Sequence, residues 1–223
     1  MGQPLFRQSF NRSDFTYAEP PEKGSPAWYE LNYAQGFSVN TENRSLQINE
    51  VEPKRPAAWD LDHGKLRGID HGEWDGRLEF IFRDPSKEPV LIKTGNIKFV
   101  FRFRQQIFFI EGLAHLGYNQ GAMFRLKCLA DTFEYEKVCD FEDAPQAILV
   151  KDDKIFIASY SGFYIVDDSF EKKVLIKDAF WGGLYPNSIA VVGDKLYIGI
   201  RGGYIQLDVD DKAFKLFKFK PVH

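Results

Sequence analysis

Sulfur is scarce in this sequence, which has two cysteines and two methionines among 223 residues. Two cysteines cannot build a disulfide framework, and by themselves they cannot complete a structural zinc site. Long apolar runs are also missing, because no stretch approaches the roughly 20 residues of a membrane-spanning helix and the N-terminal residues lack the apolar core of a secretion signal. We therefore expect a cytoplasmic protein whose cysteines stay reduced.

An excess of charge of either sign is missing too. Lys and Arg number 29, Asp and Glu number 32, and the formal net charge is −3. Binding to nucleic acid or to an anionic membrane surface selects a strong basic excess, so we expect neither as a partner. A hydrophobic content of 44% excludes a fully disordered chain, and the length allows a sizeable core.

Aromatic residues, in contrast, are abundant, with 21 Phe and 10 Tyr. From Trp28 onward, short runs rich in Ile, Val, Phe and Tyr alternate with Gly, Asp and Asn turns, as is typical of strands. The residues before this point are polar and contain several prolines. We predict an irregular arm over residues 1–27 and an all-β domain over residues 28–223. A short helical turn is expected only at Gly112–Arg125.

A 41-residue repeat occupies the second half of the chain, where residues 144–178 align with residues 185–219 without a gap. The matched pairs include Pro145 and Pro186, Ile148 and Ile189, Gly162 and Gly203, and Asp167 and Asp208. Two earlier units begin near Pro56 and Asn96, and the second of these carries an insertion at Leu113–Gln120. Each unit reads as four short strands joined by polar turns, which predicts one four-stranded antiparallel sheet per unit.

Over residues 28–220, this pattern of repeated strands and turns resembles that of β-propeller repeat proteins in the broad sense, of the WD40, Kelch or NHL-like architecture. No Trp-Asp pair ends each unit and no Kelch-type Gly-Gly recurs, so the likeness is to an architecture and not to one characterised family. The resemblance implies a small propeller of about five four-stranded blades. Residues 28–50, including the run WYELNY, are expected to form strands of a divergent fifth blade. Alternatively, they complete the C-terminal blade, or the propeller is open and incomplete.

Propellers mostly bind partners through the loops on one face, and the repeat register assigns an unlike, aromatic and charged set of residues to these loops. Trp, Tyr and Arg dominate binding hot spots, and the insertion falls among the same loops. For the aromatic members, packing between blades is the competing interpretation. The candidate binding residues are His71, Glu73, Trp74, Asp75, His115, Tyr118, Asn119, Tyr160, Trp181, Tyr185 and Arg201.

No sequence motif assigns chemistry to these loops. His71 and His115 occupy equivalent loops with Glu73 and Asp75 nearby, but the four residues lack the fixed spacing of a metal site. We therefore predict no metal, no cofactor and no catalytic residue. An enzyme with a central site built from these histidines, a carboxylate and Arg201 stays open as an alternative.

Two minor predictions concern the strands themselves. Cys128 and Cys139 flank a turn expected around Thr132–Glu136, and in a symmetric hairpin they would face each other as buried thiols. The run from Lys212 onward alternates lysines with aromatics, which predicts a strand with a charged face at a sheet edge.

Together these features favour a non-enzymatic protein-binding module, such as an inhibitor or an immunity-type protein. Another protein is the expected partner. A propeller that binds a carbohydrate or small ligand is the first alternative, although the unlike loops argue against one sugar site per blade. The enzyme with a central His and carboxylate site is the second alternative.

Overall fold

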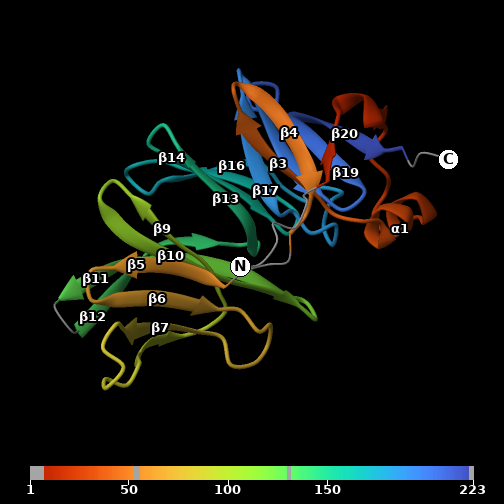
Figure 1. Cartoon of the computed structure of the whole chain (residues 1–223). Helices are drawn as coiled ribbons and strands as arrows, with labels where there is room; N and C mark the ends of the chain where they lie inside the picture. The colour runs from red at the N-terminus through yellow and green to blue at the C-terminus, as the bar shows by residue number, and fades with distance from the viewer. Residues whose placement is uncertain (1–7, 53–55, 130–131, 221–223) are drawn as a thin grey trace. The chain divides into compact units, whose positions relative to one another are not determined.

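The computed structural model describes residues 8–52, 56–129 and 132–220. Across these residues the protein is all-β, with strands arranged in five sheets (Figure 1). The chain divides into two compact units. The first comprises Met1–Pro53, Phe156–Tyr164 and Val174–His223, and the second comprises Lys54–Ile155 and Ile165–Lys173. No helix in the described residues is long and apolar enough to cross a membrane.

The second unit contains two complete four-stranded sheets that match the first two predicted repeat units. Their neighbouring strands pair antiparallel and in chain order. One sheet consists of β5 (Ala57–Leu61), β6 (Gly64–Ile69), β7 (Arg77–Phe82) and β8 (Val90–Thr94). The other consists of β9 (Ile97–Phe103), β10 (Gln106–His115), β11 (Tyr118–Leu129) and β12 (Thr132–Phe141).

The two sheets of the second unit share one hydrophobic core. Leu66, Leu78 and Phe80 of the first sheet pack with Phe109 and Phe124 of the second. The rings of Phe109 and Phe124 are stacked with their centroids 4.9 Å apart. The strands are therefore apolar on the faces that meet, as expected for sheets that cover one another.

The helical turn predicted at Gly112–Arg125 is wrong, because this segment forms the β10–β11 hairpin. Leu116 and Gly117 adopt φ angles of 46° and 87°, and His115 pairs with Tyr118 across the turn. Two consecutive residues with positive φ are the signature of the type I′ turn, whose twist suits a two-residue hairpin. The inserted residues lengthen two existing strands and add no separate element.

The cysteines of the β11–β12 hairpin do not face each other. Cys128 pairs with Phe133 and Cys139 pairs with Met123, because Leu129 pairs with Thr132 at the end of the hairpin and a bulge after Met123 shifts the register. Cys128 is exposed and Cys139 is half-buried, so the expectation of buried thiols is also wrong for Cys128. Burial raises the pKa of both thiols, that of Cys139 to about 11.

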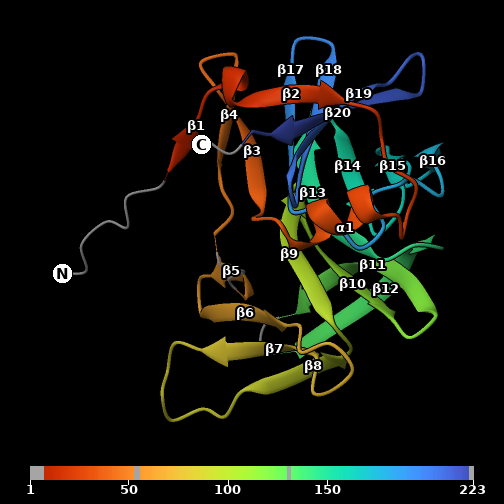
Figure 2. The same ribbon diagram turned by 90° about the vertical axis from the view of Figure 1, so that its right-hand side faces the viewer.

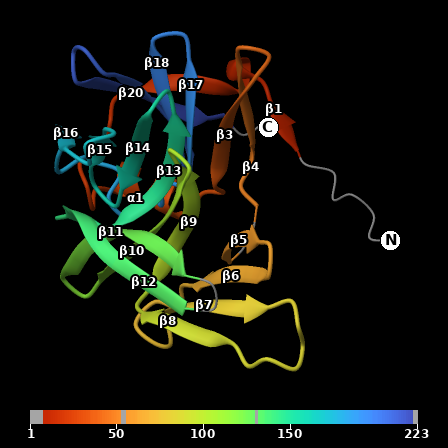
Figure 3. The ribbon, with the colours of Figure 1, turned by 90° about the vertical axis from the view of Figure 1, so that its left-hand side faces the viewer.

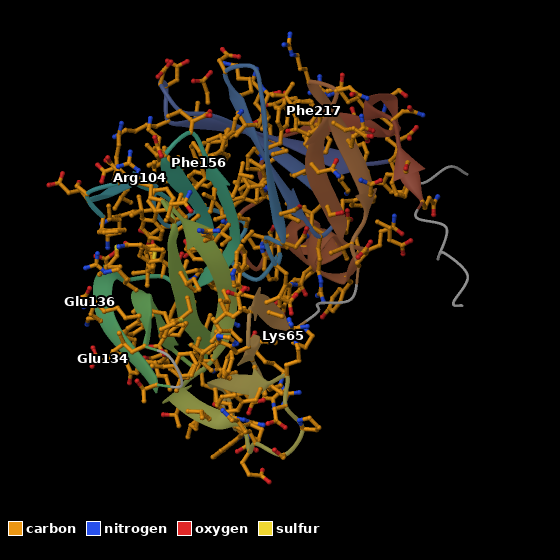
Figure 4. The ribbon with its side chains drawn as sticks, turned by 60° about the vertical axis from the view of Figure 1, so that its left-hand side comes forward. Lys65, Arg104, Glu134, Glu136, Phe156 and Phe217 are labelled. Carbon is orange, nitrogen blue, oxygen red and sulfur yellow. The ribbon has the colours of Figure 1, made fainter. Side chains whose placement is uncertain are left out.

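The third repeat unit forms a third sheet in chain order, and its residues are divided between the two compact units. Its strands are β13 (Pro145–Lys151), β14 (Lys154–Ser159), β15 (Phe163–Val166) and β16 (Lys172–Ile176). Within the second unit, Arg104 at the β9–β10 turn, labelled in Figure 4, contacts Asp153 at 3.0 Å and Asp168 at 2.7 Å. These ion pairs join the loops of two consecutive repeat units.

The fourth repeat unit forms a sheet in the first compact unit, and a strand from the N-terminal segment extends it. The repeat supplies β17 (Ser188–Val192), β18 (Lys195–Ile200), β19 (Gly203–Asp208) and β20 (Ala213–Phe219), and the added strand is β2 (Phe15–Ala18). Phe15 pairs with Phe219, and Figure 2 shows β2 alongside β20. The edge position predicted for the lysine-rich C-terminal strand is therefore wrong, and residues 15–18 differ from the irregular arm expected over residues 1–27.

A smaller sheet packs on this one within the first unit. It has the order β1 (Ser9–Phe10), β4 (Ser45–Glu50), β3 (Phe37–Glu42). Residues 28–50, expected to form strands of a divergent fifth blade, therefore supply two strands of a three-stranded sheet. A short 3-10 helix, η1 (Arg12–Asp14), separates β1 from β2. Figure 3 shows β3 and β4 beside β17, and Phe37 and Ile48 share a core there with Phe15 and Tyr204. Tyr204 also stacks on Phe217, labelled in Figure 4, with a centroid distance of 4.9 Å.

The run WYELNY is a helix, α1 (Pro26–Tyr33), so the strand predicted there is wrong. The side chain of Ser25 accepts a hydrogen bond from the Trp28 backbone N–H at 3.3 Å, and Pro26 stands at the first helical position. Ser at the N-cap followed by Pro is a strong start signal for a helix. These local signals outweigh the aromatic residues that suggest a strand.

Candidate binding site

α1 is held against the loop Phe180–Tyr185 in the first unit by two side-chain hydrogen bonds. Trp28 Nε1 donates to the carbonyl oxygen of Phe180 at 2.9 Å, and Asn32 Nδ2 donates to that of Gly183 at 2.7 Å. Trp28 is almost fully buried. The loop that joins the third and fourth repeat units is therefore fixed by a helix from the N-terminal segment.

The hairpin between β18 and β19 provides the second support of α1. Leu31 is 2% exposed, and it lies against Gly202, where a Cβ atom would come within 2.5 Å of Leu31 Cδ2. Gly202 has a φ of +77°, which favours glycine for conformational reasons as well. The close approach of helix and hairpin depends on this residue.

Arg201 is anchored at the meeting point of α1, the loop and the hairpin. Its Nη1 donates to the carbonyl oxygen of Asn32 at 2.9 Å, and its guanidinium carbon lies 4.2 Å from the centroid of the Tyr185 ring. A guanidinium over an aromatic face is a favourable cation–π contact. Of the described Asp and Glu side chains, none forms an ion pair with Arg201.

These residues surround a pocket of about 480 Å³, which we name the Arg201 pocket. It is lined by Asn32, Tyr33, Ala34, Gln35, Gly36, Val51, Tyr185, Asn187 and Arg201. In the described part of the chain, the lining contains a cation and two aromatic side chains but no acidic residue. The acidic side chain of α1, Glu30, is engaged by Lys218 at 2.6 Å, and hydrogen bonding to that lysine lowers the pKa of Glu30.

Exposed tyrosines surround the opening of the Arg201 pocket. Tyr33 is 82% exposed and Tyr185 is 54% exposed. Tyr29 is also exposed, and its ring stacks with that of Tyr33 at a centroid distance of 6.0 Å. Aromatic side chains this exposed gain little from folding, so a cluster of them around a pocket is typical of a binding surface.

Of the four predicted site residues in the first unit, the structure brings Tyr185 and Arg201 together. Tyr160 is half-buried and carries Lys23 above its ring at 5.2 Å, close to the loop that α1 contacts. Trp181 is fully buried, and its Nε1 donates to the Ser159 carbonyl at 3.4 Å. Trp181 therefore packs in the core, and its prediction as a binding residue is corrected.

The predicted residues of the β6–β7 loop lie in the second unit. Glu73 contacts Nδ1 of His115, so a carboxylate does orient one of the two histidines. His71 instead lines a pocket beside the ion pair of Lys98 with Asp70, whose atoms are 2.7 Å apart. The two histidines have different surroundings, and no contact among the described residues joins them in a common site.

The remaining predicted residues of the second unit differ in role. Trp74 is 74% exposed and Asp75 has a φ of 59°, so both belong to an exposed turn. Tyr118 is exposed and lines a pocket of about 590 Å³, whose other lining residues come from β10, β11, β12 and the end of β8 with the loop that follows it. Asn119 holds a loop in place, because its side chain contacts Asp143 and accepts from the Ala144 N–H at 2.8 Å.

Metal binding has no support in the described part of the chain, where no group of three or more His, Cys, Asp or Glu side chains is arranged to hold an ion. The residues that sequence reasoning missed include Asn32 and Tyr33 of the pocket lining and Tyr29, which stacks on Tyr33. All three lie on α1, whose start is marked by Ser25 and Pro26. Those two residues are the signal that would have found them.

Comparison with known proteins adds little to this description. No family model matches the chain, and no curated protein matches it. A crystal structure of the computationally designed Ika8 protein aligns with 81% of this chain and 73% of its own, with 7% sequence identity and a TM-score of 0.37. The class that can be stated is therefore the architectural one, an all-β chain of repeated antiparallel sheets.

Proposed function

We propose that the chain is a small β-propeller of about five blades that acts as a non-enzymatic protein-binding module. Four consecutive repeat units each form a four-stranded sheet, with one sheet extended by β2, and this regularity supports the propeller. Propellers are a common scaffold for binding through loops. The scaffold alone does not define a function, and the support for protein binding comes from the residues around the Arg201 pocket.

The observation that carries the proposal is the group of exposed tyrosines around the Arg201 pocket. Tyr29, Tyr33 and Tyr185 present aromatic surface to solvent while α1 and its loop are held by buried Trp28 and Leu31. A rigid support with exposed Tyr and Arg side chains matches the composition of protein interfaces. The partner in this proposal is a protein that covers these tyrosines.

The test uses the wild-type chain and a double variant, Tyr33→Ala with Tyr185→Ala. Proteins captured from a cell extract by each form are identified, and a candidate is then purified and titrated against both. We expect a one-to-one complex that is weakened about 30-fold or more in the double variant, because hot-spot residues contribute 2 kcal/mol or more.

A matched control is available in the same unit. Tyr17 on β2 is 52% exposed, does not line the pocket, and its substitution by Ala should change the affinity by less than about twofold. Circular dichroism and thermal unfolding verify that all variants are folded. A purified partner that binds the double variant as tightly as the wild type contradicts the proposed site, and so does a search that yields no partner sensitive to it.

A further inference from the structure

We infer that the Arg201 pocket recognises a carboxylate on the partner, within an acidic peptide segment that also carries an aromatic or aliphatic side chain. This inference rests on the proposed function and specifies the chemistry of the same site. Four observations support it: the unpaired charge of Arg201, its fixed orientation, the absence of acids in the lining, and the apolar walls.

The charge of Arg201 is not neutralised by any described carboxylate. Arg67, Arg104 and Arg125 each contact a Glu or Asp side chain. Among the described residues, the side chain of Arg201 has polar or cation–π contacts only with a backbone carbonyl and a tyrosine ring. A guanidinium has five N–H donors, and the contact with Asn32 engages only Nη1. Other N–H donors of the fork-shaped guanidinium group therefore remain available to a ligand.

The orientation of that fork is set before any ligand arrives. Tyr185 supports one face of the guanidinium at 4.2 Å, and the Asn32 carbonyl fixes its edge at 2.9 Å. Arg binds carboxylates through two parallel hydrogen bonds when the fork is presented edge-on. Because the side chain is already held, less rotamer entropy is lost on binding.

The surroundings favour an acidic ligand over a basic one. Among the residues that the structure describes, no Asp or Glu lines the pocket, and Glu30 forms an ion pair with Lys218. Beside the guanidinium, Tyr33 and Val51 offer apolar surface. The volume of about 480 Å³ lies in the range of roughly 300–1,000 Å³ usual for ligand pockets. A carboxylate next to an apolar side chain complements both features.

The experiment begins with a displayed library of random heptapeptides, which is selected separately on the full chain and on its Arg201→Gln variant. We expect Asp or Glu next to an aromatic or aliphatic residue to be enriched on the wild type and not on the variant. The best peptide is then synthesised together with a counterpart in which each Asp or Glu is replaced by Asn or Gln. Both peptides are titrated by calorimetry against both forms of the protein.

The expected result is a double-mutant cycle with strong coupling. Removing the carboxylate should weaken binding at least tenfold on the wild type and less than twofold on Arg201→Gln. Arg201→Lys, which keeps the charge but loses the fork, should fall between them. Arg12 is the matched control, because it also contacts a tyrosine, with its Nη2 2.8 Å from Tyr197 Oη, and Arg12→Gln should bind like the wild type.

Two results would overturn the inference. One is a library selection on the wild type that enriches neutral or basic peptides. The other is a loss of affinity on removing the peptide carboxylates that is as large for Arg201→Gln as for the wild type. These outcomes are distinct from failure of the proposed function. Suppose that the double variant Tyr33→Ala with Tyr185→Ala no longer binds a purified partner, whereas Arg201→Gln binds it as tightly as the wild type does. In that case the protein-binding proposal holds and the carboxylate inference fails.

Discussion

Leu31 and Gly202 approach so closely that a Cβ atom at Gly202 would lie 2.5 Å from Leu31 Cδ2. Gly202 also has a φ of +77°, where side chains are strained. We predict that Gly202→Ala lowers the free energy of unfolding by about 2–3 kcal/mol, from backbone strain and overpacking together. Urea denaturation, followed by tryptophan fluorescence, measures the change in the free energy of unfolding. Buried Trp28 reports on it because this residue lies on α1, the helix that a Cβ atom at Gly202 would push away.

A substitution at Gly193 distinguishes backbone strain from overpacking. It has a φ of +61° in the same unit, but a Cβ atom there would meet nothing within 4 Å. Gly193→Ala should therefore cost only the strain, about 1 kcal/mol. Equal losses for the two variants would show that the contact with Leu31 does not limit the approach of α1.

Phe15 connects β2 to the aromatic core of the first unit, where its ring lies 5.1 Å from Phe37 and 5.1 Å from Tyr204. We predict that Phe15→Ala destabilises the protein by about 3 kcal/mol, the usual cost of removing a buried ring. Tyr17→Ala, on the same strand but 52% exposed, should cost less than about 1 kcal/mol. Chemical denaturation of both variants checks the contrast, and similar costs would contradict the assignment of Phe15 to the core.

Glu79 is the buried acid between two arginines of the β6–β7 pair. Burial by itself would raise the pKa of Glu79, but hydrogen bonds from Arg77 at 2.8 Å and Arg67 at 2.6 Å outweigh it and lower that pKa. A lowered pKa in the folded state means that the carboxylate stabilises the fold above the ordinary pKa of Glu, about 4.3. This stabilisation is lost as the pH falls through the folded-state pKa.

We therefore predict that Glu79→Gln lowers the free energy of unfolding by about 1.5–3 kcal/mol at pH 7, the range of a hydrogen bond to a charged group. At a pH well below the folded-state pKa, the wild type and the variant should differ much less. Urea denaturation across the acidic range tests this. A difference that does not shrink with falling pH would contradict the assigned role.

The two thiols should be slow to react and unable to join within one chain. Because burial raises the pKa of Cys139 to about 11, its thiolate fraction at neutral pH is roughly a hundredfold below that of a thiol with a pKa near 9. Cys128 and the residue paired with Cys139, Met123, are separated along β11 by roughly 16 Å at about 3.3 Å per residue. A disulfide requires Cα atoms within about 7 Å.

Mass spectrometry after timed alkylation measures the rate at each cysteine, with the urea-unfolded chain as the control. Mild oxidation of the dilute protein should leave both thiols free. An intramolecular Cys128–Cys139 disulfide formed without unfolding would contradict the hairpin register.

Sequence reasoning predicts the sheets of this protein well because the repeat constrains them collectively. Pro145 is the first residue of β13 and Pro186 lies two residues before β17. A gap-free alignment of whole units reduces the ambiguity of any one short run. The first two units are found in the same way, even where the β10–β11 hairpin is lengthened. The strand content therefore follows from periodicity alone.

Prediction fails where a single local feature decides the outcome. At α1, the N-cap of Ser25 and the following Pro26 outweigh the strand tendency of Trp28 and the tyrosines. At the cysteines, the positions of a turn and a bulge determine the register. For the candidate site, Tyr185 and Arg201 could be placed from the repeat register. Tyr33 could not, because it comes from outside the repeats through a contact remote in sequence.

The pairing of β2 with β20 imposes an order on folding during synthesis. Phe15 and Phe219 are partners, so β2 is made about 200 residues before the strand that it needs, and closing so long a loop is slow. At about 5–20 residues per second, the wait lasts on the order of 10–40 s. The second compact unit consists almost entirely of Lys54–Ile155 and can form meanwhile, whereas the Arg201 pocket appears only when the last strands emerge.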